Sequence, residues 1–192
     1  MNEPAIEVDD AVVLLLGAPS EIPRLHGRLQ GITRLEKMIF LLERETSLGT
    51  YLTEDADFIA YNFGPFSAKV YQEVETLAAA GLLVDSATPT DNPADSWERF
   101  SAIDAVQDAP PEDTYATRDF ALTDLGQRYY EVLARQLPAK AVEEVARFKD
   151  RFASVPLRQL VQYVYQKYPD YTERSLIRDD ILGQPPTHDD CH

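Results

Sequence analysis

The chain of 192 residues predicts a mainly helical fold with a small β-hairpin. Apolar residues recur at helical spacing in segments that begin at good N-cap residues or at proline, which indicates amphipathic helices. Residues 85–119 lack this spacing and carry several prolines and aspartates, which indicates strands and loops. The apolar content of 44 % and the charged content of 27 % are ordinary for a globular chain.

The N-terminal segment predicts a short buried helix over residues 9–16. Two aspartates precede its apolar run, and negative charge favours a helix start, while a glycine follows the run and ends it. Residues 17–31 predict a loop. Arg24 and Arg28 in this loop stand out as basic residues in an acidic chain.

The segment GITRLEKMIFLLERE predicts a helix over residues 33–46. Thr33 and Glu36 fit a capping box, in which each side chain satisfies the backbone N–H group of the other residue. The apolar residues that follow recur at positions i, i+3, i+4 and i+7, which places them on one stripe of a helix.

The segment FIAYNFGPFSAKVYQEVETLAAAG predicts a strand, a turn and another helix. Residues 58–63 alternate aromatic and small side chains, which indicates a short strand. Gly64 and Pro65 indicate a turn. Ser67 is a good N-cap residue for a helix over residues 67–80.

The stretch from residue 85 to residue 119 predicts a hairpin with a long acidic tip. It carries nine acidic and two basic residues, a net charge of −7. Residues 97–103 and 115–122 are the expected strands of this hairpin.

The C-terminal part of the chain predicts three helices and a last helix-like piece in TERSLIRDDIL. Thr123 is the expected N-cap of the first helix, and Pro138 and Pro156 are expected to open the next two. The residues that the first of these helices is expected to bury are Leu125, Tyr129, Val132 and Leu133.

The order of the expected elements indicates a winged-helix-like domain plus a C-terminal helical extension. Residues 9–136 give helix, helix, strand, helix, hairpin and helix, with residues 85–119 as an acidic insert in the wing. Residues 137–183 form the expected helical extension, and residues 184–192 a disordered tail.

Patterns typical of catalysis are absent from the sequence. It contains no glycine-rich phosphate loop, no zinc-protease or dithiol pattern and no nucleophile elbow, so we expect no enzyme activity and no cofactor. The tail sequence HDDCH holds residue types that bind metals. A terminal cluster without further ligands elsewhere does not close a structural zinc site, so no metal is expected.

The charge and the single cysteine restrict the compartment and the partners. The net charge of −15 repels phosphate and anionic lipid. One cysteine permits no internal disulfide bond, the acidic start differs from a signal peptide, and the longest apolar run is too short to cross a bilayer. We therefore expect a cytoplasmic protein without membrane contact.

The expected helix over residues 67–80 has the position of a DNA recognition helix but the wrong charge. Its exposed positions carry one base and two acids, whereas DNA readers present basic and amide side chains. A protein partner fits better, and direct DNA binding stays open as the alternative. The candidate partner-binding residues are Tyr61, Phe66, Lys69, Gln72, Glu73 and Glu75. The candidates for contact with nucleic acid or a partner are Arg24, Arg28 and Arg34.

Residues 137–183 differ electrostatically from the rest of the chain. They carry eight basic and seven acidic residues and are rich in tyrosine. Tyrosine and arginine are frequent in interfaces, so these helices could form a homodimer contact. An amphipathic helix packed on the core explains the same pattern, and both interpretations remain open.

Three segments in order resemble the SocA-like (Panacea) antitoxin domain and its YwgA-like relatives. They are GITRLEKMIFLLERE, AYNFGPFSAKVYQEVETLAAAGLL and YVYQKYPDYTERSLIRDDIL. The resemblance covers roughly residues 9–180, with the 85–119 insert as a departure from the short pattern of the family. The matching positions are Gly31, Thr33, Leu35, Lys37, Phe40, Tyr61, Gly64, Pro65, Ser67, Val70 and Tyr71.

This resemblance implies a bacterial or phage protein with a helical, winged-helix-like domain. Such domains neutralise co-encoded toxins by direct binding, and some relatives lie beside defence genes. The expected function is that of a protein-binding module: a SocA-like antitoxin, or an accessory subunit of a toxin–antitoxin or phage-defence system. The alternative is a winged-helix transcription regulator that binds DNA as a dimer.

Overall fold

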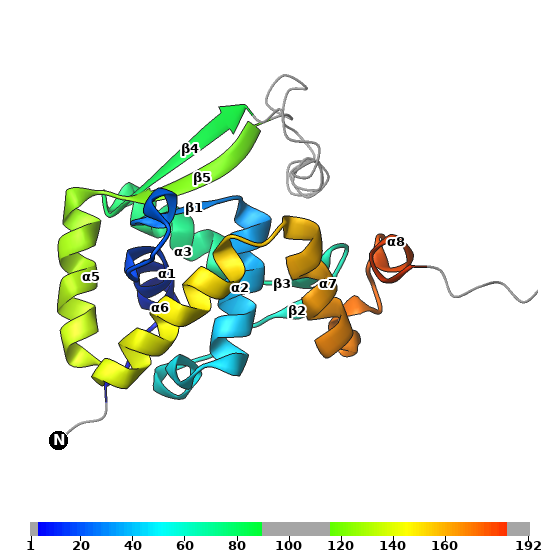
Figure 1. Cartoon of the computed structure of the whole chain (residues 1–192), viewed down its shortest axis with the longest axis horizontal. Coiled ribbons are helices and arrows are strands. Elements are labelled where there is room, and N and C mark those ends of the chain that lie inside the picture. The colour runs from blue at the N-terminus through cyan, green and yellow to red at the C-terminus, as the bar shows by residue number, and fades with distance from the viewer. Residues whose placement is uncertain (1–3, 90–115, 184–192) are drawn as a thin grey trace, which may run out of the picture.

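The computed structural model describes residues 4–89 and 116–183, which form helices around a small antiparallel sheet (Figure 1). The α-helices are α1 (Val8–Gly17), α2 (Ile32–Glu45), α3 (Ala68–Ala79), α5 (Asp124–Gln136), α6 (Ala139–Ala153), α7 (Leu157–Lys167) and α8 (Arg178–Leu182). The 3-10 helices are η1 (Pro23–Leu25), η2 (Ser47–Tyr51) and η5 (Pro169–Thr172). The strands are β1 (Arg28–Gln30), β2 (Ile59–Tyr61), β3 (Gly64–Phe66), β4 (Leu83–Pro89) and β5 (Ala116–Leu122).

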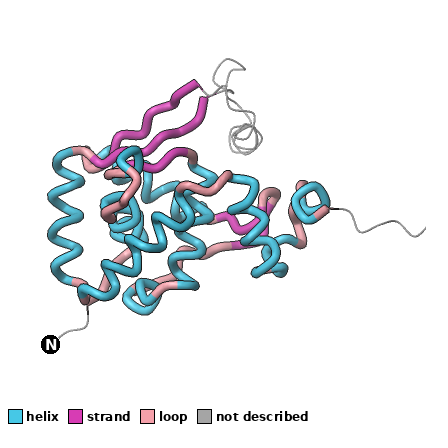
Figure 2. Tube along the Cα trace, in the orientation of Figure 1, coloured by secondary structure: helices cyan, strands magenta, loops and turns pink. Residues whose placement is uncertain are grey.

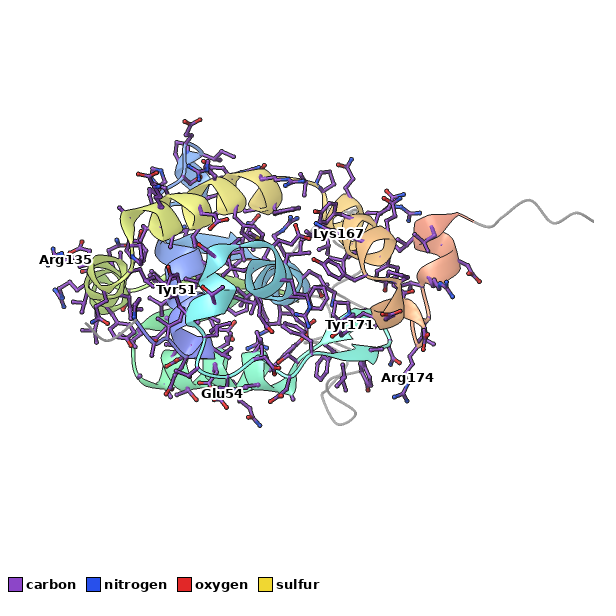
Figure 3. All side chains as sticks on the ribbon, turned by 90° about the horizontal axis from the view of Figure 1, so that it is seen from below. Tyr51, Glu54, Arg135, Lys167, Tyr171 and Arg174 are labelled. Atoms are coloured by element: carbon purple, nitrogen blue, oxygen red, sulfur yellow. The ribbon has the colours of Figure 1, made fainter. Side chains whose placement is uncertain are left out.

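Helices α1 and α2 form the middle of the molecule. Figure 3 shows α6 along one side of these two helices and α3 along the opposite side. Helix α5 lies at one end of the molecule, and α7 and α8 lie at the other (Figure 1). Because α2 is covered from several sides, every residue from Leu35 to Leu42 is buried. A helix that is buried all round carries the core of the fold.

The larger sheet has the strand order β1-β5-β4, with antiparallel pairing throughout. Figure 2 shows it along one edge of the helical body. Strand β1 pairs Leu29 with Phe120, and both side chains are buried. The sequence predicted a loop over residues 17–31, so β1 was missed. A strand of three residues with one buried side chain is too short to give a periodic pattern.

The expected hairpin exists with a different first strand. Strand β5 lies where residues 115–122 were predicted to be extended, but its hairpin partner is β4 (Leu83–Pro89). The predicted strand over residues 97–103 and the acidic tip lie outside the described residues. The tail over residues 184–192, with its HDDCH sequence, also lies outside them.

Strands β2 and β3 form a second, two-stranded sheet. Tyr61 pairs with Gly64, so Asn62 and Phe63 make the turn between them. The sequence placed this turn at Gly64 and Pro65, which was wrong, because these two residues belong to strand β3. A Gly-Pro pair favours a turn by composition alone, whereas Gly64 is needed here for its close contact with Tyr165 of helix α7.

The N-terminus of α2 differs from the predicted capping box. The helix begins at Ile32 with Gly31 at the N-cap, so Thr33 is already inside the first turn. Glu36 lies in the second turn, and its carboxylate accepts a hydrogen bond from the backbone N–H of Ser67 instead. The tertiary contact therefore replaces the local cap.

Helix α5 begins after Thr123, as predicted, and the Thr123 hydroxyl accepts a hydrogen bond from Gly126 N–H at 3.1 Å. Its predicted buried face was confirmed at Leu133 and was wrong at Leu125 and Val132. Leu125 and Val132 are 47 % and 48 % exposed. The residues that α5 buries are Gly126, Tyr130 and Leu133. The cause is close packing at Gly126, where a Cβ would lie 2.0 Å from the carbonyl oxygen of Leu82.

The other helices agree with the sequence. Ser67 caps α3, and α6 and α7 begin directly after Pro138 and Pro156. The apolar core runs without a break from α1 and α2 into α6 and α7. The segment before residue 137 and the C-terminal helices therefore share one core.

A candidate binding groove beside helix α3

A buried ion pair joins helix α2 to strand β3. Lys37 and Glu36 are 1 % and 3 % exposed, and Lys37 Nζ lies 3.1 Å from Glu36 Oε2. Lys37 Nζ also donates a hydrogen bond to the Pro65 carbonyl at 2.6 Å. The other carboxylate oxygen, Glu36 Oε1, accepts a hydrogen bond from Ser67 N–H at 2.9 Å. Burial raises the pKa of Glu36, and the adjacent Lys37 charge acts against this shift.

The segment Gly64–Ser67 is held from further sides as well. The Ser67 hydroxyl accepts a hydrogen bond from Val70 N–H at 3.1 Å and donates one to the Ala56 carbonyl. Gly64 has a φ of +90°, and a Cβ there would lie 2.6 Å from Cε1 of Tyr165. Tyr165 is fully buried in α7, and burial raises its pKa to about 12. This segment therefore has a fixed position between α2, α3 and α7.

A groove opens in front of this segment, between α2, the β2–β3 hairpin and α3. Its main pocket has a volume of about 380 Å³. The residues that line it are Thr33, Glu36, Lys37, Tyr61, Phe63, Gly64, Phe66, Ala68, Tyr71, Gln72 and Glu75. A shallower hollow of about 470 Å³ adjoins it and shares Phe66, Ala68 and Gln72 with it. We call the two hollows together the α3 groove.

Aromatic rings form the apolar wall of the α3 groove. The ring centroids of Tyr61 and Phe66 are 5.1 Å apart, and those of Phe66 and Tyr71 are 5.4 Å apart. All three rings remain partly exposed. Such a row of half-buried aromatic side chains is typical of binding surfaces.

Carboxylates and ammonium groups form the polar part of the α3 groove. The main pocket contains Glu36, Lys37 and Glu75, and the shallow hollow adds further charged residues, namely Glu54, Asp57, Lys69 and Glu73. Lys69 Nζ lies 2.7 Å from Glu54 Oε1. Glu54 is labelled on the α3 side of the molecule in Figure 3. Burial raises the pKa of Glu73, and the negative charge of Asp9 adds to this shift.

The structure brings together the six residues that the sequence nominated for partner binding. Tyr61, Phe66, Gln72 and Glu75 line the main pocket. Lys69 and Glu73, together with Phe66 and Gln72, line the shallow hollow.

Sequence reasoning missed several of the lining residues. Phe63 and Tyr71 complete the aromatic wall. Glu36 and Lys37 form the buried base of the groove. Tyr71 follows Ala68 by three positions on α3, so helical spacing could have placed it on the same face. The charged pair Glu36–Lys37, set among the apolar residues of the predicted helix over residues 33–46, was a further signal, since buried charges need partners.

The three nominated arginines lie elsewhere. Arg24 and Arg28 are exposed on η1 and β1 and do not line the groove. Arg34 Nη1 donates hydrogen bonds to the carbonyls of Phe152 and Val155, at 3.3 and 2.6 Å. Arg34 therefore fixes the α6–α7 connection.

Within residues 4–89 and 116–183, no three His, Cys, Asp or Glu side chains are placed to hold a metal ion. None of the helices there is both long and apolar enough to cross a membrane. No known protein family, curated protein or solved structure matches the chain at a significant level.

Proposed function

We propose that this chain is a protein-binding module that acts by direct contact with a co-encoded protein. It would serve as a SocA-like antitoxin or as an accessory subunit of a bacterial toxin–antitoxin or phage-defence system. The observation that carries the proposal is the α3 groove. It combines a partly exposed aromatic wall with a backbone segment fixed by the buried Glu36–Lys37 pair.

A preformed groove suits protein recognition for an energetic reason. A surface that is already ordered loses little conformational entropy on binding, so more of the contact energy appears as affinity. Tyr61 and Phe66 offer large apolar areas with few rotatable bonds, which is the profile of interface anchors. The acidic excess of the whole chain favours a partner with a basic surface.

Co-purification with the products of the neighbouring genes tests this proposal. The tagged chain should elute with one stoichiometric partner at near-physiological salt. Glu75→Arg, an exposed change inside the groove, should weaken that complex by about tenfold or more. Glu131→Arg is the matched control, because Glu131 is exposed on α5 and does not line the groove. Failure of every neighbour to co-purify would contradict the proposal.

A winged-helix transcription regulator is the second candidate. The order α1, β1, α2, α3, β4, β5, with the β2–β3 hairpin between α2 and α3, and the sheet order β1-β5-β4 favour it, since winged-helix domains place a helix before a β-hairpin wing. The acidic face of α3 is unfavourable for phosphate contact. Binding to its own upstream DNA at low salt, weakened by Arg24→Ala and Arg28→Ala, would support this candidate. The absence of any mobility shift at low salt would remove it.

A further inference from the structure

We infer that the α3 groove takes an arginine side chain from a basic segment of the partner protein, stacked on the aromatic wall and paired with Glu75. This inference rests on the proposed protein-binding function and adds the chemistry of the partner to it. Three features of the groove indicate this ligand. Its aromatic rings can stack on a flat cation, and its carboxylates can balance the positive charge. The adjoining shallow hollow gives room for neighbouring residues of the segment.

The aromatic wall selects a cation that can stack. Aromatic faces attract positive charge, and a planar guanidinium covers a ring better than an ammonium group does. The same contact occurs within this chain, where the Arg44 guanidinium lies 4.0 Å from the centre of the Phe40 ring. In the groove the partly exposed rings of Tyr61 and Phe66 offer this contact to an outside group.

Within residues 4–89 and 116–183, the cations that lie near the groove are bound to carboxylates of the same chain. Lys37 is paired with Glu36, and Lys69 with Glu54. Arg118 lies 5.9 Å from the centre of the Tyr71 ring, but it does not line the groove. Its guanidinium donates to the carboxylate of Asp85 at 2.5 Å.

The charges that line the groove leave a negative excess. Among the described residues that line it, five carboxylates, those of Glu36, Glu54, Asp57, Glu73 and Glu75, face two ammonium groups, those of Lys37 and Lys69. Burial and, after it, the negative charge of Asp9 raise the pKa of Glu73, and Glu54 of the groove adds to this shift. A cationic segment would relieve the repulsion, whereas an anionic ligand would increase it.

The shape of the groove indicates a peptide segment. The main pocket is large enough for one long side chain, and Glu75 and Gln72 lie on its lining as acceptors. The shallow hollow continues it past Phe66 and carries three carboxylates of its own. A segment with an arginine in the main pocket can therefore place a second basic residue in the shallow hollow.

The test uses the full chain and a pair of small probes. N-acetyl-arginine amide and its neutral isostere N-acetyl-citrulline amide are titrated into the isotope-labelled protein, and backbone amide shifts are recorded by NMR. We expect saturable shifts at Tyr61, Phe66, Tyr71 and Gln72 with the arginine probe only. Glu75→Gln should weaken this binding about three- to fivefold, the size of an exposed ion pair. Glu131→Gln, remote from the groove, should leave it unchanged.

Each outcome of this test bears on the inference. Equal binding of both probes, shifts outside the groove, or no effect of Glu75→Gln would overturn it. Failure of the arginine-site inference can be separated from failure of the proposed protein-binding function. A partner that co-purifies while the groove shows no arginine preference leaves the protein-binding function and overturns only the arginine site. Arginine-selective shifts without any co-purifying protein would contradict the protein-binding function and support only the arginine site.

Discussion

At the scale of single residues, Lys149 shows how a buried charge is used as a helix cap. It lies on α6 with no exposed surface, and its Nζ donates hydrogen bonds to the carbonyls of Leu16 and Ala18, at 2.6 and 3.0 Å. These carbonyls end helix α1, where unpaired acceptors and the negative end of the helix dipole favour a cation. Burial lowers the pKa of Lys149 from 10.5 to about 8.

This lowered pKa predicts a pH dependence of stability. Above about pH 8 the native lysine loses its proton, whereas the unfolded chain keeps it until about pH 10.5. The unfolded state then binds more protons, so the free energy of unfolding should rise with pH across this window, by at most about 1.4 kcal/mol per pH unit. Lys149→Met should lack this rise. Urea denaturation of both proteins between about pH 7.5 and 9.5 checks it, and parallel profiles would contradict it.

The Glu36–Lys37 pair predicts a strongly non-additive double-mutant cycle. Glu36→Gln or Lys37→Met alone leaves a buried charge without its partner, which costs about 3 to 5 kcal/mol of unfolding free energy. The double variant should lose clearly less unfolding free energy than the sum of the losses of the two single variants. Asp180→Asn is the control, because its pair with Arg158 is 65 % and 49 % exposed at the two side chains. That change should cost less than about 1 kcal/mol. Additive losses at Glu36 and Lys37 would argue against a coupled pair.

At the scale of elements, the β2–β3 hairpin depends on one close approach. Gly64 and Gly81 both have positive φ angles, of +90° and +72°. A Cβ at Gly64 would meet the Tyr165 ring at 2.6 Å, whereas a Cβ at Gly81 would meet nothing within 4 Å. The two positions therefore separate the backbone cost of a side chain from its steric cost.

Alanine at these two glycines should have unequal effects. Gly81→Ala carries the backbone cost, about 1 to 2 kcal/mol. Gly64→Ala should exceed it by roughly 1 to 3 kcal/mol, because the hairpin must also move away from α7. Thermal or urea denaturation measures both losses. Amide shifts at Tyr61 and Phe66 should change only in Gly64→Ala, and equal losses without such changes would refute the packing argument.

At the scale of the whole molecule, one core joins the two predicted regions. Phe148 and Phe152 of α6 and Leu160 and Val164 of α7 are buried in the same apolar cluster as α1 and α2. Arg34 adds hydrogen bonds across the predicted boundary. Arg135 and Arg174 point away from opposite ends of this shared body in Figure 3.

The shared core predicts that a chain ending at Leu137 does not fold alone. Removing α6 and α7 exposes apolar faces of α1 and α2, which a small domain cannot compensate. The NMR spectrum of the chain that ends at Leu137 should show poor dispersion. Adding residues 138–192 as a separate chain should restore the native pattern. A well-dispersed spectrum of the fragment by itself would establish two independent domains.

The sequence by itself determined most of the helices and the six nominated groove residues. Caps such as Ser67 and Thr123, prolines before α6 and α7, and helical spacing act between near neighbours, so they can be recognised without the fold. Only the tertiary structure decided the strand β1, the partner of β5, the buried face of α5 and the true role of Glu36. Each of these depends on contacts between residues distant in the chain, such as Glu36 with Ser67 or Gly126 with Leu82. The spacing of residues along the chain carries no information about such contacts, because they form only when elements distant in the sequence pack against one another.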